Sequence, residues 1–90
     1  MNIDISYLPT DAGVYLFKDA SGTILYIGKA KNLQKRVSQY FAPGSLWKQE
    51  MLIKAASVDF LVVKNEGEAL YLESNLIKKH KPFYNTMLKG

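Results

Sequence analysis

Cysteine is absent from this 90-residue chain, and histidine occurs once, at His80. Without cysteine the chain has no disulfide framework, no thiolate nucleophile and no cysteine-ligated zinc or iron–sulfur site, which suits a reducing compartment. The single histidine excludes most histidine chemistry, and we expect His80 to be an exposed residue at a helix end. Any catalysis must therefore use other side chains.

Long apolar runs are also missing. No segment approaches the length of a transmembrane helix, and the first ten residues, MNIDISYLPT, carry acid where a signal peptide needs a basic and then an apolar run. Ninety residues supply one core, so we expect residues 1–90 to form a single domain. The simplest expectation is a soluble cytoplasmic protein.

Positive charge is in moderate excess and unevenly distributed. Twelve Lys and Arg against eight Asp and Glu give a net charge of +4, which fits nucleic-acid binding without requiring it. Acidic residues are spread thinly, whereas basic residues gather at positions 29–36 and 78–81. The two clusters form one surface if the fold brings them together.

Three short segments are predicted to be strands. GVYLFK (13–18) and TILYIG (23–28) are rich in β-branched and aromatic residues and are joined by DASG, which is typical of a hairpin. VDFLVVK (58–64) is the third. Because the strands are apolar on both faces, we expect a small, mainly antiparallel three-stranded sheet with helices on both sides, an α+β (mixed α/β) domain.

Three helices are predicted around this sheet. Asn32 is a helix cap, and the apolar residues that follow it have helical spacing as far as Pro43-Gly44: Leu33, Val37, Tyr40 and Phe41. A weaker helix is expected over about 46–56, and a strong one over 65–80 that ends before Pro82.

Glu73 is the most informative position in the predicted helix over 65–80. Its neighbours three and four residues away are all apolar: Ala69, Leu70, Leu76 and Ile77. Desolvation of an unpaired carboxylate is costly. Glu73 therefore either has a cation, a metal or several donors as partner, or lies at the edge of the apolar stripe and reaches water, and spacing alone leaves both open.

Tyr15 and Tyr26 lie on neighbouring strands of the predicted hairpin. Either their hydroxyls converge on one patch, or the two tyrosines are half-buried packing residues whose hydroxyls are exposed to solvent. Lys29 follows Tyr26 closely, past Gly28, where we expect the strand to end and the backbone to turn. A nearby ammonium lowers the pKa of a phenol from about 10, and a phenol tuned in this way acts as a general base.

Arg36 borders the buried face of its predicted helix. A guanidinium there can hold a phosphate through two hydrogen bonds and offset the charge that develops during phosphodiester cleavage. Lys31 and Lys35 are either phosphate-steering residues or an ordinary solvated surface, and no P-loop motif is present. Asn85 follows the stiff, apolar segment 82–84, which would present its amide at a fixed place.

Several of these residues fall in motifs that resemble the GIY-YIG nuclease family. Gly13-Val14-Tyr15 and Tyr26-Ile27-Gly28 are similar to the two half-motifs that name the family, with Val in place of Ile in the first. KAKNL, Arg36, EALYLESNLIKKHKP and Tyr84-Asn85 follow in the family's order and extend the resemblance over nearly the whole chain. The KAKNL and LIKKHKP motifs favour the members that act in bacterial excision repair.

The resemblance implies a metal-dependent DNA endonuclease that, in nucleotide excision repair, cuts on the 3′ side of a lesion with the help of repair partners. It implies one divalent cation, Mg²⁺ or Mn²⁺, held by Glu73. The catalytic residues that it implies are Tyr15, Tyr26, Lys29, Arg36 and Asn85. We further predict DNA contacts from Lys31, Asn32, Lys35, Tyr40, Lys78 and Lys79.

Two alternatives remain open at this point. A stand-alone homing-type or structure-specific nuclease of the family shares the chemistry but not the pathway, and the chain is either such a protein or one domain of a longer one. A non-catalytic DNA-binding module shares only the basic surface. Glu73 discriminates against the module, because phosphate binding needs cations and gains nothing from a carboxylate.

Overall fold

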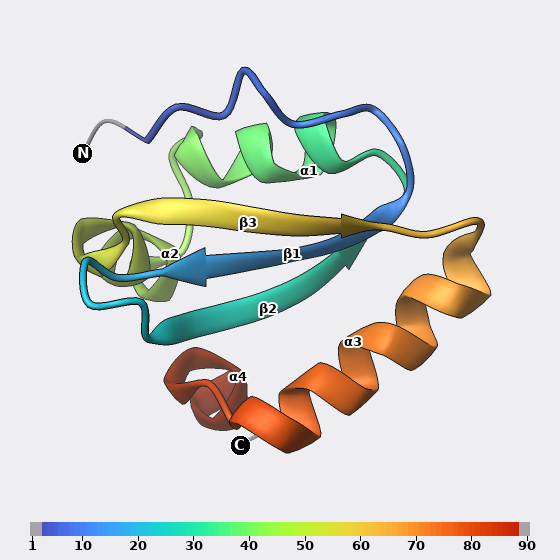
Figure 1. The fold of residues 1–90 in the computed structure, drawn as a ribbon. Coiled ribbons are helices and arrows are strands. Elements are labelled where there is room, and N and C mark those ends of the chain that lie inside the picture. Colours follow the sequence, from blue (N-terminus) through green and yellow to red (C-terminus); the bar gives the residue numbers. More distant parts are fainter. Residues whose placement is uncertain (1–2, 89–90) are drawn as a thin grey trace.

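The computed structural model describes residues 3–88, which form three strands and five helical segments (Figure 1). Their order is β1 (Gly13–Lys18), β2 (Ile24–Ala30), α1 (Leu33–Ser38), the 3₁₀ helix η1 (Gln39–Phe41), α2 (Leu46–Lys54), β3 (Ser57–Val62), α3 (Glu66–His80) and α4 (Phe83–Leu88). The strands form one antiparallel sheet in the order β2-β1-β3, so β2 and β3 are its edges. The predicted α+β class is confirmed.

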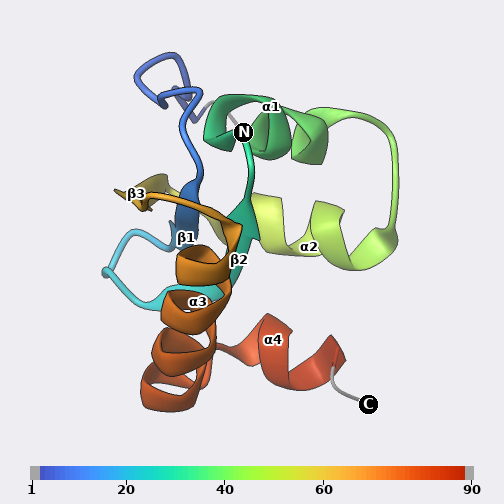
Figure 2. The same cartoon turned by 90° about the vertical axis from the view of Figure 1, so that its right-hand side faces the viewer.

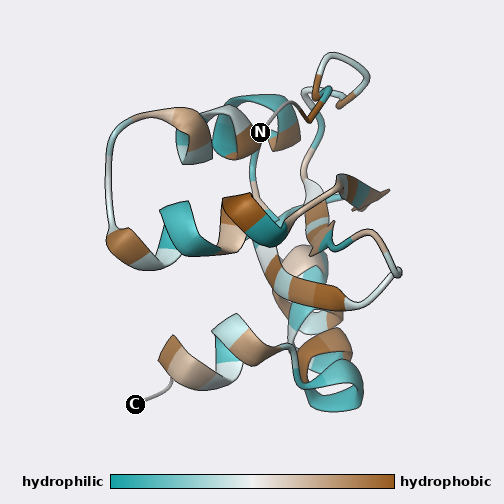
Figure 3. Ribbon diagram, turned by 90° about the vertical axis from the view of Figure 1, so that its left-hand side faces the viewer, coloured by the Kyte–Doolittle hydropathy of each residue, from teal (hydrophilic) through white to brown (hydrophobic). Residues whose placement is uncertain are grey.

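Helices cover both faces of the sheet, as the two apolar faces of its strands require. In the side view of Figure 2, α1 and α2 lie to the right of the strands and α3 lies below them on the left. Between α3 and the sheet is a core that includes Val14 and Ile27. The opposite core is larger and includes Tyr15, Phe17 and Tyr84. The helices alternate between hydrophobic and hydrophilic bands, as expected for elements that bury one side (Figure 3).

The β1–β2 hairpin forms as predicted, but β2 continues past Gly28 to Ala30. The Asp19 carboxylate closes the turn by accepting hydrogen bonds from the backbone of Ser21 at 3.0 Å and Thr23 at 2.9 Å. The prediction that Gly28 ends the strand is therefore wrong. The ladder pairs Gly28 with Tyr15 in regular register and continues for two more residues.

The first predicted helix is shorter than its apolar pattern suggested. Asn32 caps α1, because its Oδ1 accepts a hydrogen bond from the backbone N–H of Lys35 at 3.0 Å. After Ser38 the chain tightens into η1, a common way for a helix to end. The tighter turn directs Tyr40 into the core and leaves Phe41 exposed.

The C-terminal part contains one helix that was not predicted. Helix α3 ends at Lys81, which has left-handed backbone with φ 45°, and the buried Pro82 follows. The next six residues form α4, which is too short to show a helical period in the sequence. Tyr84 fixes α4 to α2, because its hydroxyl donates to the Glu50 carboxylate at 2.9 Å.

Within residues 3–88, no helix has both the length and the hydropathy needed to cross a membrane.

Asn65 sets the start of α3, the helix that carries Glu73. Its Oδ1 accepts a hydrogen bond from the backbone N–H of Glu68 at 2.9 Å. Asn65→Ala removes this cap, and we expect it to lower the free energy of unfolding by about 1 kcal/mol in urea denaturation. The matched control is Asn75→Ala on an exposed turn of α3, where alanine should be neutral or slightly stabilising. Equal effects of both changes would contradict the capping role.

Candidate active site

The candidate site lies along the free edge of β2, where the two faces of the sheet meet. Side chains alternate along this strand, so that Tyr26 packs on the core under α1 and α2 whereas Ile27 belongs to the core under α3. By the same alternation Lys29 lies on the α3 side. Groups from both helical layers can therefore reach one strand edge.

Gly28 allows the Tyr15 side chain to reach that edge. Tyr15 and Gly28 are direct partners in the β1–β2 ladder, and the buried Tyr15 ring lies across the Gly28 backbone. A methyl group on Gly28 would overlap the tip of the ring and its hydroxyl. The glycine is therefore needed for close approach, not for the turn that the sequence suggested.

Three tyrosines meet at this place. The hydroxyls of Tyr15 and Tyr40 are 2.7 Å apart, and the ring centroid of Tyr26 is 6.4 Å from that of Tyr15 and 6.2 Å from that of Tyr40. Burial, followed by its two tyrosine neighbours, raises the pKa of Tyr40. Burial raises the pKa of Tyr15, and the hydrogen bond with Tyr40 acts to lower it. Of the two alternatives that the sequence left open, the structure supports convergence, because Tyr15 and Tyr26 belong to one cluster.

Tyr40 itself does not contribute to a DNA-facing surface. It is 3% exposed and its ring is enclosed by those of Tyr15, Phe17 and Trp47. The prediction that it contacts DNA is wrong, whereas its assignment to the apolar side of the helix is correct. Its hydroxyl instead orients Tyr15 from within.

Arg36 reaches the cluster from α1. Its guanidinium lies beside the Tyr15 hydroxyl, an interaction that raises the pKa of Arg36 above its ordinary value. Its Nη1 donates to the Gln39 side-chain oxygen at 3.3 Å. Arg36 is exposed, so the guanidinium is held in position while remaining open to an anionic ligand.

Glu73 faces Lys29 from α3. Its side chain is half-buried beside Leu72, Leu76 and Ile77, whereas Leu70, one of the neighbours expected in the apolar stripe, is exposed. Desolvation raises the pKa of Glu73, although the ammonium and backbone N–H of Lys29 act in the opposite direction. Burial therefore outweighs the one cation beside it, and the carboxylate would gain from further positive charge.

The expected effect of Lys29 on Tyr26 is not observed. Desolvation is the main reason why the pKa of Tyr26 is raised, and the charge of Glu73 raises it further, while Tyr40 and Arg36 act to lower it. Lys29 acts on Glu73 instead, because the two side chains lie on the same side of β2. In the free domain Tyr26 is a protonated phenol at neutral pH.

Asn85 is close to the site but bonded to the backbone. Its Oδ1 accepts from the Ile27 N–H at 2.8 Å, and its Nδ2 donates to the Ile27 carbonyl at 2.9 Å. Both ends of the amide are therefore engaged with β2, beside Tyr26. The geometry supports a positioning role for Asn85, and the catalytic role that the resemblance implies stays a prediction.

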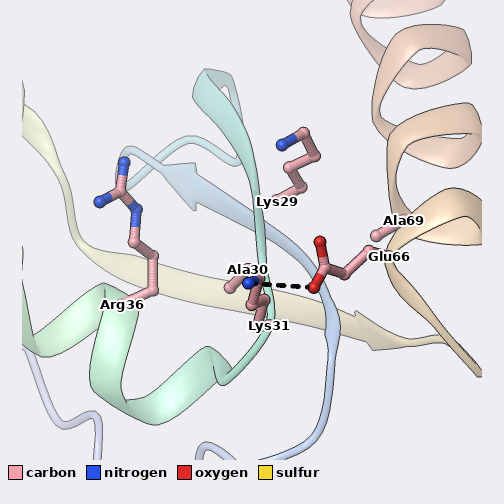
Figure 4. A pocket seen from close by; sticks show the side chains of 6 residues that line it. All are labelled: Lys29, Ala30, Lys31, Arg36, Glu66 and Ala69. Atoms are coloured by element: carbon pink, nitrogen blue, oxygen red, sulfur yellow. Dashed lines mark ion pairs between the residues drawn. The ribbon is translucent and has the colours of Figure 1, made fainter.

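The remaining predicted residues are dispersed. Asn32 is the cap of α1, and Lys35 is exposed on that helix. Lys31 lines a pocket next to the site and pairs with Glu66 at 3.3 Å (Figure 4). Lys78 and Lys79 lie in the last turn of α3, about 18 Å along the helix axis from Glu66 at 1.5 Å per residue, and thus away from this pocket.

Two residues near the site were not predicted. Trp47 of α2 packs on Tyr26 with ring centroids 5.1 Å apart, and Glu66 faces Lys31. One aromatic residue or one acid near a helix start is too common to single these out. Tyr40 could be predicted to lie near Arg36, because it follows four residues later within the predicted helix.

Comparison with known proteins decides the family. The model of the UvrC-like GIY-YIG domain matches residues 11–86, which is most of the chain. The chain belongs to the UvrC-like GIY-YIG domain family. This confirms the resemblance found in the sequence motifs.

Relatives within the family are similar over nearly the whole chain. A UvrABC system protein C from Protochlamydia amoebophila is 51% identical over 94% of this chain, and one from Methanococcoides burtonii is 52% identical over 99%. The chain spans 14% and 15% of their lengths, about one seventh. The N-terminal GIY-YIG endonuclease domain of UvrC from Thermotoga maritima, solved with its catalytic divalent cation, magnesium, is 42% identical, with a TM-score of 0.82 over 89% of both chains.

Gly28→Ala tests the packing of Tyr15 that shapes this site. The added methyl group must displace a fully buried ring, so we expect a loss of about 1–3 kcal/mol in the free energy of unfolding, measured by urea denaturation. Gly67→Ala is the matched control, since Gly67 lies in the exposed first turn of α3, where alanine should be neutral or stabilising by up to about 1 kcal/mol. Wild-type stability of the Gly28 variant would contradict the close approach.

Proposed function

We propose that this domain is a divalent-cation-dependent endonuclease that hydrolyses phosphodiester bonds of DNA. The observation that carries the proposal is Glu73, a half-buried carboxylate beside Lys29, in a site that is otherwise cationic and phenolic. The description of the T. maritima relative as an endonuclease domain bound to its catalytic magnesium supports the proposal.

The residues present fit one divalent cation. Among residues 3–88, no three His, Asp or Glu side chains are grouped as a metal cage, so Glu73 would supply a single ligand. Mg²⁺ and Mn²⁺ prefer oxygen ligands, and Mg²⁺ keeps several waters, which leaves room for a substrate phosphate. When bound, such a cation supplies charge stabilisation at the leaving oxygen. A partly desolvated carboxylate with a raised pKa is stabilised by this added charge.

The other side chains of the site would bind the phosphate, handle the proton of the attacking water and balance charge. The Arg36 guanidinium, oriented by the Tyr15 hydroxyl, holds the phosphate and offsets the negative charge that grows on its oxygens. The Tyr26 hydroxyl orients the attacking water, and the phenolate that forms when Tyr26 gives up its own proton to solvent takes a proton from this water on Oη. A cation that offsets the charge of Glu73 would remove the contribution by which Glu73 raises the pKa of Tyr26, which favours formation of the phenolate. Lys29 balances the charge of Glu73.

The pathway and partners are proposed from the relatives. Because the proteins that match over this region belong to the UvrABC system, we propose that the domain makes the 3′ incision of nucleotide excision repair. Its substrate would be lesion-containing duplex DNA, and its protein partners would be UvrB together with UvrA. We propose a cytoplasmic location on the same ground.

A module that only binds DNA is less consistent with the site. Contacts to phosphates need cations, and an acid in the middle of such a surface weakens them. Glu73 is held in that place although its burial costs free energy. This cost is understandable if the carboxylate carries a cation.

Glu73→Gln tests the metal ligand. We expect at least a ~100-fold loss of Mg²⁺- or Mn²⁺-dependent nicking, because the removed charge supports several kcal/mol of transition-state stabilisation. Stability should not fall. Desolvation raises the folded-state pKa above the unfolded value, so the ionised carboxylate lowers stability at neutral pH and glutamine removes that penalty.

The assay is single-turnover nicking of lesion-bearing duplex DNA, with the repair partners present and absent. Glu68→Gln is the control on the same helix, since Gln keeps the ability to cap the helix start. Nicking by the Glu73 variant at the rate of this control would contradict the assignment of Glu73 as the metal ligand. Full activity of the unaltered domain without the partners would indicate a self-sufficient nuclease.

Tyr26→Phe removes only the hydroxyl proposed to handle the proton. We expect nicking to slow by about 10²–10⁴-fold, the usual contribution of general acid–base catalysis. Tyr71→Phe, on an exposed face of α3, should leave the rate unchanged. A near-normal rate for the Tyr26 variant would assign the proton transfer to another group.

A further inference from the structure

A pocket of about 250 Å³ opens beyond the C-terminal half of β2, between α1 and α3 (Figure 4). It is lined by Lys29, Ala30, Lys31, Arg36, Glu66 and Ala69. Three of these side chains are cationic and one is acidic, so the pocket has a net charge of +2. This charge favours an anion as ligand.

The pocket is continuous with the candidate site. Lys29 and Arg36 line it, and these same residues contact Glu73 and Tyr15 respectively. Figure 4 shows Arg36 coming from α1 on one side of β2 and Glu66 coming from α3 on the other. Because Arg36 lines both the candidate site and the pocket, a DNA strand that Arg36 contacts would pass the pocket.

The acid in the pocket is held by one of the cations. The Lys31 ammonium lies 3.3 Å from the Glu66 carboxylate, and the two side chains point toward each other across the gap between β2 and α3. The side chains are 80% and 64% exposed. An ion pair as exposed as this contributes little to stability, so a phosphate can replace Glu66 as the partner of Lys31 at small cost.

We propose that this pocket binds a backbone phosphate of a DNA strand that Arg36 also contacts, and that Glu66 occupies Lys31 until DNA displaces it. Glu66 is then a built-in competitor that weakens DNA binding by the domain alone. This proposal rests on the proposed function only in taking DNA as the ligand, and it does not require the domain to cut.

The test is the affinity of the Glu66→Gln variant for a short fluorescein-labelled DNA duplex, measured by anisotropy with a chelator in place of divalent cations. We expect binding to tighten about twofold to fivefold at low salt, the range that corresponds to one exposed ion pair. The gain should shrink as salt rises, because exposed charges are screened.

Asp59→Asn is the matched control. Asp59 is also an exposed acid paired with a lysine, Lys18, but it lies on β3 at the opposite edge of the sheet. Both substitutions remove one negative charge, so any difference between their gains in DNA affinity is due to the pocket. An equal gain in the two variants would overturn the proposal, because the change in net charge alone would then explain the tighter binding of DNA.

A second measurement asks whether the gain depends on Lys31. In the Lys31→Ala background, Glu66→Gln should no longer tighten binding, since the cation that it frees is missing. A gain of the same size without Lys31 would overturn the proposal, as would weaker binding by the Glu66→Gln variant itself. If the unaltered domain binds DNA but never nicks it, the proposed function fails while this test still decides the pocket.

Discussion

The site depends on one packing constraint, the passage of the Tyr15 ring across the backbone of Gly28. Cross-strand pairing sets the two residues opposite each other, and the missing side chain lets a buried ring extend to the edge of the sheet. Tyr40 and Arg36 are then arranged around the Tyr15 hydroxyl, one by a buried hydrogen bond and the other from the exposed side of α1. The sheet register thus determines where the guanidinium is held.

Charge is divided between the two layers that meet at β2. Arg36 belongs to the layer of α1 and α2, whereas Glu73 and Lys29 belong to the side of α3. Lys29 does not fully offset the desolvation of Glu73. A functional site commonly keeps such a locally unfavourable group, because the group becomes favourable once its ligand is bound. In this domain the unfavourable group is Glu73, whose charge acts on Tyr26 of the tyrosine cluster.

Local patterns in the sequence predicted the hairpin, the third strand, the cap at Asn32 and the position of Glu73 on an otherwise apolar stripe. These features depend on neighbours a few residues away. What could not be predicted depends on contacts between distant segments. The strand continues through Gly28 because of its partner Tyr15, Lys29 acts on Glu73 rather than Tyr26, and Asn85 bonds to Ile27, 58 residues away. Family motifs named the residues of the site but not which of them contact each other.

The free edge of β2 explains why these roles can be combined. An exposed strand edge invites pairing with another chain, and proteins protect such edges with charged side chains or a covering segment. Here the Asn85 amide satisfies the N–H and carbonyl of Ile27 as a neighbouring strand would, while Lys29 and Lys31 place positive charge along the next residues. The lysines that oppose strand pairing are also the residues that we propose attract a phosphate backbone. An edge strand would thus give this small domain an anion-binding surface without an additional element, and α3 would need to add only the carboxylates.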